Sequence, residues 1–118
     1  MKIYVAHSSG FDFKKELYEV IRNSDLNIEH EIVLPHEQSS ELFNPKEYFE
    51  ECDLVISECS YHSTGMGIEL GWADDKKVRI ICIHKDDTNP SSSLKSVTNE
   101  FVEYSSPEEL INKLKEII

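Results

Sequence analysis

The sequence is poor in cysteine, with only three in 118 residues and no CxxC pair. An odd number of cysteines without a recognisable spacing argues against a disulfide framework, so we expect a reduced, cytoplasmic protein. Cys52, Cys59 and His62 match no familiar zinc spacing, and no fourth ligand is evident. We therefore expect neither a metal site nor a cofactor, and we interpret Cys82 as a buried core residue.

Long apolar runs and an excess of positive charge are also missing. No run approaches the roughly 18 apolar residues of a membrane helix, and no basic stretch precedes an apolar one as in a secretion signal. The 12 basic and 23 acidic residues give a net charge of −11. This charge repels phosphate and so disfavours nucleic acid polymers and anionic membranes as partners, but backbone N–H groups could still hold a small anionic ligand.

The length of the chain favours one domain that spans residues 1–118. Short apolar runs predict strands, and apolar residues at helical spacing predict helices between them. The expected strands are 2–6, 30–34, 53–58, 78–84 and 101–104. The expected helices are 11–23, 45–52 with Asn44 as its cap, 66–75, a short turn at 94–98, and a last helix that begins at Pro107.

Strands and helices alternate along the whole chain, which predicts an α/β fold. We expect a three-layer sandwich with a five-stranded, mostly parallel sheet of the flavodoxin-like or Rossmann-like kind. Ligands of such sheets bind at the carboxyl ends of the strands, near the switch in strand order. Polar residues collect after the first, third and fourth strands, at 7–9, 60–67 and 91–93. The sequence therefore predicts a small-molecule site at this edge.

The segment 63–73 is the most informative part of the sequence. Gly65 and Gly67 precede or open a helix, so backbone N–H groups there could approach a ligand closely. We place Glu69 in the first turn of this helix, where a carboxylate either reacts with a ligand or simply favours the helix dipole. Gly71 costs about 1 kcal/mol inside a helix, which suggests tight packing against the sheet or a ligand. We interpret Trp72 as a core or dimer contact.

These residues resemble the nucleoside 2-deoxyribosyltransferase family, which includes the 2'-deoxynucleoside 5'-monophosphate N-hydrolases. The resemblance is carried by the first strand at 2–6, by the run 53–58, and by the residues 63–65 and 67–73. It implies that a glutamate attacks C1' of a deoxyribosyl group and forms a covalent glycosyl ester. Water then completes a hydrolase, and a second base completes a transferase.

The resemblance also implies roles for individual residues. Glu69 matches the nucleophile, and Ser63 matches a serine that holds the 5' end of the substrate. Ser93, or its neighbour Ser92, is similar to a second such serine that a partner subunit supplies, so the resemblance implies a homodimer. Ser8 falls in the first loop, which touches the same end. From its place on the first strand, Tyr4 either lines the sugar site or packs in the core, and we interpret Glu58 as structural.

The sequence departs from the family's pattern at three places. Asn44 and Pro45 stand where the family has an acidic residue that assists departure of the base, and Asn44 cannot carry that proton. Glu41 or Glu47 could substitute. His7 stands where the family has glycine, and it either supplies the missing acid or only makes hydrogen bonds. The segment 7–12 has no arginine for a phosphate.

Three functions remain open. The first is an N-glycosidase or deoxyribosyltransferase that acts on a small nucleoside or nucleotide through Glu69, with His7 as a second catalytic candidate. The second is a non-catalytic module that binds or senses a nucleotide, which the change at Asn44 motivates. The third is an NAD-cleaving glycohydrolase, by analogy of fold alone. A phospho-receiver is disfavoured because no acidic residue directly follows the first strand, and a dinucleotide-binding fingerprint is absent.

Overall fold

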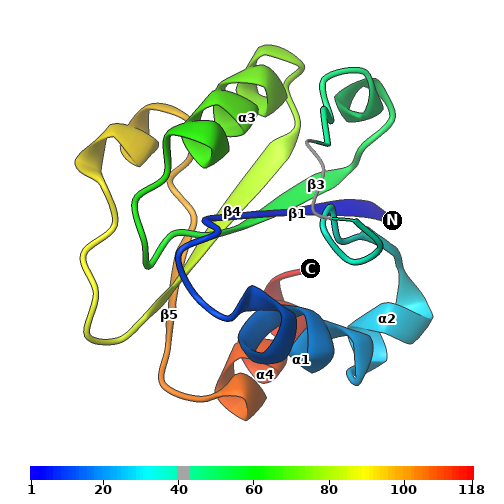
Figure 1. The fold of residues 1–118 in the computed structure, drawn as a ribbon, viewed down its shortest axis with the longest axis vertical. Helices are drawn as coiled ribbons and strands as arrows, with labels where there is room; N and C mark the ends of the chain where they lie inside the picture. Colours follow the sequence, from blue (N-terminus) through cyan, green and yellow to red (C-terminus); the bar gives the residue numbers. More distant parts are fainter. Residues whose placement is uncertain (40–42) are drawn as a thin grey trace.

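A computed structural model describes residues 1–39 and 43–118 of the chain. Its centre is a five-stranded sheet with the strand order β2-β1-β3-β4-β5, in which every described strand pair is parallel. Figure 1 shows the sheet between two layers of helices. The strands are β1 (Lys2–His7), β2 (Glu31–Val33), β3 (Leu54–Glu58), β4 (Arg79–Lys85) and β5 (Phe101–Tyr104).

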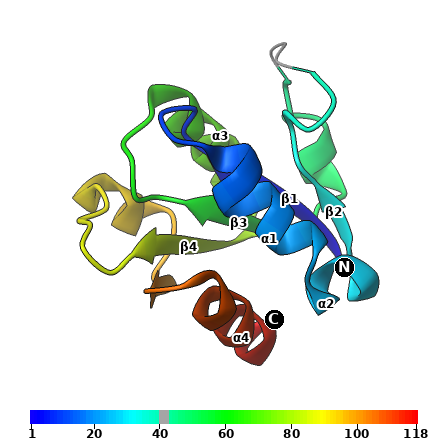
Figure 2. The same cartoon turned by 60° about the horizontal axis from the view of Figure 1, so that its bottom comes forward.

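Helices cover both faces of the sheet (Figures 1 and 2). One face carries α1 and α4, and α2 lies beyond α1; the other carries α3 with two short 3-10 helices. The α-helices are α1 (Glu19–Arg22), α2 (Asp25–Glu29), α3 (Thr64–Asp75) and α4 (Pro107–Ile117). A π-helical turn η1 (Lys14–Tyr18) leads into α1, and the 3-10 helices are η2 (Tyr48–Glu50) and η3 (Ser92–Ser96).

The two faces of the sheet bury two separate hydrophobic cores. Ile21 of α1 and Leu114 of α4 belong to the first core, and Leu70 of α3 and Phe49 of η2 belong to the second. The middle strands β1 and β3 are apolar on both faces, because each face is covered. The expected three-layer α/β sandwich of the flavodoxin-like kind is confirmed, and the sheet is parallel throughout rather than mostly parallel.

The helix expected at 11–23 forms as one continuous helical segment within those bounds, although not as a regular α-helix throughout. Its first half is the π-helical turn η1, and a separate helix α2, which was not predicted from the sequence, follows α1. Ser24 separates the two helices: its extended backbone begins α2, and its hydroxyl donates to the carbonyl of Ile21 at 2.6 Å. A side chain that binds the preceding turn in this way competes with continuation of the helix.

The prediction of a helix at 45–52 is wrong, because only the short 3-10 helix η2 forms in that region. The side chain of Asn44 accepts the backbone N–H of Lys46 at 3.0 Å, which closes a tight turn rather than capping a regular helix. The helix expected at 66–75 begins two residues earlier, at Thr64. The turn expected at 94–98 is η3, which also begins two residues earlier.

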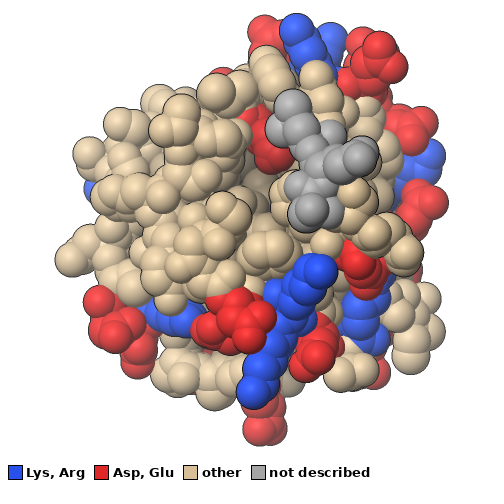
Figure 3. All heavy atoms as spheres, viewed as in Figure 1, with Lys and Arg blue, Asp and Glu red and all other residues tan. Residues whose placement is uncertain are grey.

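Charge is distributed unevenly over the surface. On the face shown in Figure 3, acidic and basic side chains gather along the lower and right margins, and the upper left is nearly free of them. None of the helices in the described part of the chain has the length and apolar character needed to cross a membrane. The strand order reverses between β1 and β3, and sheets of this kind bind their ligands at the carboxyl edge beside such a reversal.

Candidate functional site

An open cavity of about 400 Å³ lies at the reversal point of the sheet. Its walls come from three segments: the end of β1 with the residues that follow it, the chain that follows β2, and α3 with its N-cap Ser63. This size falls within the range of small-molecule sites, about 300–1,000 Å³. The lining residues are His7, Ser9, His36, Phe43, Asn44, Ser63, Gly65, Met66, Ile68, Glu69 and Trp72.

Glu69 is the only carboxylate among the described residues that line this cavity. It lies in the second turn of α3. The prediction that it lies in the first turn is wrong, because the helix begins at Thr64 rather than at residue 66. The side chain is half-buried, and burial raises its pKa, while the hydrogen bond from Tyr4 opposes that rise. The carboxylate thus faces the cavity with Tyr4 as one fixed donor, a setting in which it can act as a nucleophile.

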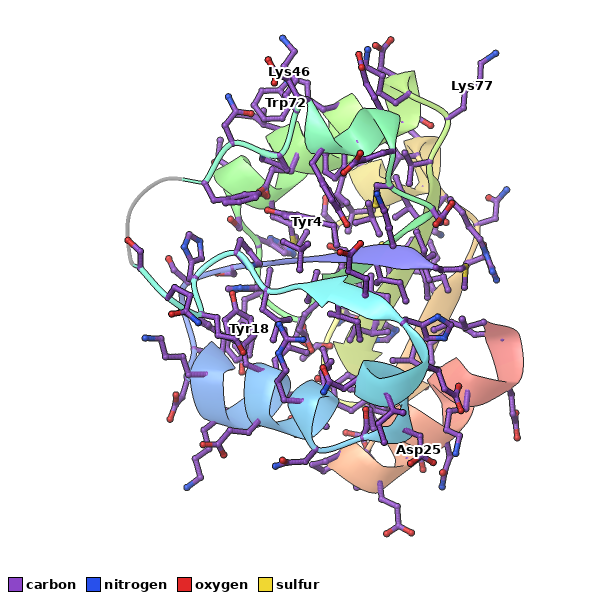
Figure 4. The ribbon with its side chains drawn as sticks, turned by 90° about the vertical axis from the view of Figure 1, so that its right-hand side faces the viewer. Tyr4, Tyr18, Asp25, Lys46, Trp72 and Lys77 are labelled. Carbon is purple, nitrogen blue, oxygen red and sulfur yellow. The ribbon has the colours of Figure 1, made fainter. Side chains whose placement is uncertain are left out.

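Tyr4 fixes the position of that carboxylate. Its hydroxyl donates to Glu69 Oε1 at 2.7 Å and lies 3.3 Å from Oε2. The tyrosine comes from β1 and is fully buried, with its ring edge-on to Phe49 at 5.3 Å and stacked on Phe43 at 5.9 Å. Figure 4 shows Tyr4 on the α3 side of the sheet. Burial raises the pKa of Tyr4, so the phenol remains a donor over the whole working range.

Ser63 is the N-cap of α3. Its Oγ accepts the backbone N–H of Met66 at 3.3 Å, which leaves the hydroxyl proton free for a ligand in the cavity. Gly65 also lines the cavity, whereas Gly67 is exposed beside it. A Cβ atom at Gly71 would meet nothing within 4 Å, so the expected tight packing against the sheet is wrong.

His7 lines the cavity, but both of its ring nitrogens have partners. Nδ1 donates to the carbonyl of Ser8 at 2.8 Å, and Nε2 lies 2.6 Å from the hydroxyl of Tyr18. Because Nδ1 carries the proton for that carbonyl, Nε2 accepts from Tyr18 in the neutral ring. Burial lowers the pKa of His7, and a charge on His36 lowers it further. The geometry thus favours a neutral His7.

The three serines proposed from the sequence have different positions. Ser8 is buried, and its Oγ accepts the N–H of Gly10 at 3.0 Å; its neighbour Ser9 lines the cavity instead. Ser93 is exposed on η3 and does not line the cavity. Its predicted contact with a substrate held by a second subunit remains a prediction.

A second hollow of about 270 Å³ adjoins the cavity and shares Ser63 and Met66 with it. The hydroxyls of Tyr61, Thr64 and Ser91 line this hollow together with His62. Neither hollow is lined by a lysine or an arginine among the described residues. The two hollows together therefore offer hydroxyls and the N-terminus of α3, but no permanent positive charge, to a ligand.

Three aromatic side chains of the site were not predicted as site residues from the sequence, nor were Met66 and Ile68. His36 and Phe43 lie in the chain that follows β2, and Trp72 lies on α3. The sequence pattern drew attention to the loops after strands one, three and four only, although β2 pairs with β1 and its loop therefore reaches the same edge. Trp72 packs against the second core, as expected, and it also lines the cavity. The Nζ atom of Lys46 lies 5.6 Å from the centre of its ring (Figure 4).

The nucleoside 2-deoxyribosyltransferase family has an acidic residue that assists departure of the base. Apart from Glu69, none of the described residues that line the cavity is acidic. Asn44 does line the cavity, as its match to that position implies. Glu47 is exposed and outside the lining, and Glu41 falls outside the described residues. No group of three or more metal-binding side chains occurs in residues 1–39 and 43–118. Cys52 and Cys59 instead place their thiols on backbone carbonyls.

Two solved structures have similar folds. The CMP N-glycosidase BcmB of Clostridium botulinum superposes with a TM-score of 0.68 and 24% identity, over 98% of this chain and 99% of that chain. A putative pilus assembly-related protein of Burkholderia pseudomallei K96243 superposes with a TM-score of 0.54 and 10% identity, over 98% and 87% of the two chains. No protein-family model and no curated protein sequence matches. These similarities show the fold, over almost the whole chain.

Proposed function

We propose that the chain cleaves, or transfers at, the N-glycosidic bond of a nucleoside or nucleotide, with Glu69 as the nucleophile. The observation that carries this proposal is the position of the Glu69 carboxylate, which is half-buried, faces an open cavity of about 400 Å³ and is held by one phenol. A carboxylate that is placed but not fully bonded keeps lone pairs available for a substrate carbon.

The proposed reaction divides one displacement into two. One Glu69 oxygen attacks C1' of the sugar, and the bond from C1' to the base nitrogen breaks with its electron pair on the base. Tyr4 continues to donate to the carboxylate and holds its orientation. Water, or a second base, then attacks C1' and frees Glu69. Two displacements give overall retention at C1', as in retaining glycosidases.

The rest of the cavity suits the same class of substrate. The aromatic rings of Phe43 and Trp72 offer flat apolar surfaces for a base. The hydroxyls of the adjoining hollow and the N-terminus of α3 suit the sugar and its 5' end. A homodimer in which Ser93 of one copy reaches the site of the other would complete that end.

The similarity to BcmB supports the reaction class. That protein is described as a CMP N-glycosidase, and the similarity spans nearly the full length of both chains. The absence of a lysine or arginine among the described lining residues distinguishes this site from a typical phosphate pocket. The phosphate requirement is therefore the first question for the experiment.

The test is chromatographic detection of free base. The protein is incubated with deoxynucleosides, deoxynucleoside monophosphates, ribonucleotides including CMP, and NAD, beside a Glu69→Gln control. Base released by the wild type alone is the expected result, and the substrate consumed defines the sugar and the phosphate requirement. If folded, concentrated protein releases no base from any of them, the proposal is wrong and a binding module takes its place.

A further inference from the structure

His36 is a polar side chain of the cavity wall whose ring lacks hydrogen-bond partners in the described part of the chain. Its Nδ1 is buried without a hydrogen-bond partner among the described residues, and no hydrogen bond of residues 1–39 and 43–118 involves its ring. Buried polar atoms are nearly always paired in folded proteins, so such an atom calls for an explanation. The position of His36 in the cavity wall supports one explanation, namely that a bound ligand supplies the missing partner.

The other titratable and amide side chains that line the cavity already have hydrogen-bond partners. His7 is bonded at both nitrogens, and Glu69 is held by Tyr4. Asn44 accepts a backbone N–H, and an amide does not carry an exchangeable acidic proton at neutral pH. Among the described lining residues, His36 is therefore the one titratable side chain with free ring nitrogens.

The surroundings of His36 fix its backbone and place its ring beside that of His7. Its backbone N–H donates to the hydroxyl of Tyr18 at 3.0 Å, and its ring packs edge-on to His7 at 5.7 Å. That hydroxyl in turn bonds to His7, whose pKa is lowered by burial. His7 is bonded at both ring nitrogens, so among these two imidazoles it is His36 that keeps a free nitrogen for a ligand.

The charged groups around His36 come from three elements. Glu69 lies across the cavity on α3, and Glu37, the next residue in the chain, is paired with Arg22 of α1 at 2.8 Å. A nucleophile needs an ionised carboxylate and a general acid needs a group that can carry a proton, and Glu69 and His36, which line the same cavity, are groups of these two kinds.

We infer that His36 is the general acid and base of this site, taking the place of the acidic residue that Asn44 replaces; the inference rests on the proposed N-glycosidic cleavage. In the first step the His36 imidazolium gives its proton to the departing base, as the C1'–N bond breaks and Glu69 bonds to C1'. In the second step neutral His36 takes a proton from water, whose oxygen bonds to C1' and releases the Glu69 carboxylate. The products are free base and free sugar, and both side chains return to their starting states.

The test compares leaving groups. Values of kcat/KM, which report steps up to the covalent intermediate, are measured for the substrate cleaved fastest in the base-release test and for the 4-nitrophenyl glycoside of the same sugar. His36→Ala is expected to slow base release by about 10²- to 10⁴-fold. The 4-nitrophenyl glycoside should be cleaved at nearly the wild-type rate, because 4-nitrophenolate leaves without a proton. His36→Gln, which keeps the size and polarity of the side chain, should behave in the same way.

The pH profile gives a second readout. Wild-type kcat/KM for the natural substrate should fall at alkaline pH as His36 loses its proton, and this fall should vanish in His36→Ala. His30→Ala is the matched control, since His30 lies at the end of α2 beside the amino terminus, and it should keep the wild-type profile. Equal slowing of both substrates, or no slowing in folded His36 variants, would overturn the inference. No base release by the wild type would instead overturn the proposed function.

Discussion

Two glutamates at the same edge of the sheet have opposite surroundings. Glu58, at the end of β3, is fully buried; Oε1 accepts the N–H of Ser60 at 2.6 Å, and Oε2 accepts the hydroxyl of Tyr104. Glu69 is half-buried, has the phenol of Tyr4 as its donor, and faces an open cavity. Both carboxylates bind a tyrosine from a strand, but only Glu69 keeps room for a substrate. Incomplete bonding beside a cavity, rather than burial alone, distinguishes the reactive candidate from the structural one.

The largest expected effect is the loss of activity in Glu69→Gln. The amide oxygen can still accept from Tyr4, but it is no nucleophile, so base release should fall by more than about 10³-fold. The folded pKa of Glu69 is raised, so its proton is bound more tightly in the folded state, and the ionised form costs stability once the pH rises through that pKa. The variant should therefore be as stable as the wild type at pH 7, or more stable by about 1 kcal/mol. Assays and thermal unfolding measure the two effects.

Glu58→Ala should have the reverse effect. It leaves the hydroxyl of Tyr104 and the N–H of Ser60 without their partner in a buried place. The free energy of unfolding should fall by about 3 kcal/mol, as measured by urea denaturation. Base release per folded molecule should remain near the wild-type value. A stable Glu58→Ala protein that has lost activity would show that Glu58, and not Glu69, has the reactive role.

Tyr4→Phe should move the acid side of the pH profile. The Tyr4 hydrogen bond lowers the pKa of Glu69 against the effect of burial, so removing the hydroxyl raises that pKa further. Because activity needs the carboxylate, kcat/KM at a pH below both pKa values should fall in proportion to the ionised fraction of Glu69, and it should recover as the pH rises. The check is kcat/KM against pH. An unchanged acid limb would show that Tyr4 does not control the ionisation of Glu69.

Tyr104→Phe, the matched change at the other glutamate, should have the smallest effect. It removes the hydroxyl that bonds to Glu58 and should cost about 1–2 kcal/mol of stability. The pH profile of base release should match that of the wild type, because Tyr104 does not line the Glu69 cavity. A shifted profile in this variant would couple the two glutamates and weaken the contrast between them.

The fold was largely predictable from the sequence because buried parallel strands are short apolar runs and the helices between them have one apolar face. The strand runs around Val5, Ile56 and Ile81 all formed the expected sheet. The short helices were predicted less well. Local bonds of Ser24 and Asn44 to the backbone decide where those segments turn, and apolar spacing does not report such bonds.

The site was predictable only in part. The polar loops follow from the rule that ligands bind at the carboxyl ends of strands, whereas the role of Glu69 was predicted from the resemblance to the nucleoside 2-deoxyribosyltransferase family. The Tyr4–Glu69 bond joins residues 65 positions apart, and the inclusion of His36 depends on β2 pairing beside β1. Such contacts are set by the order of the strands in space, which the sequence pattern does not specify. The preference for Glu69 over Glu58 likewise needed their hydrogen-bond partners.

The most direct test of the central claim is to trap the glycosyl ester and locate it. A substrate with fluorine at C2' should slow the water step, because fluorine destabilises the oxocarbenium-like transition state, and the ester should accumulate. Mass spectrometry of the intact protein should then show one added sugar, and peptide mapping should place it on Glu69. Label on Glu58, or base release by a protein that never carries the sugar, would contradict the account.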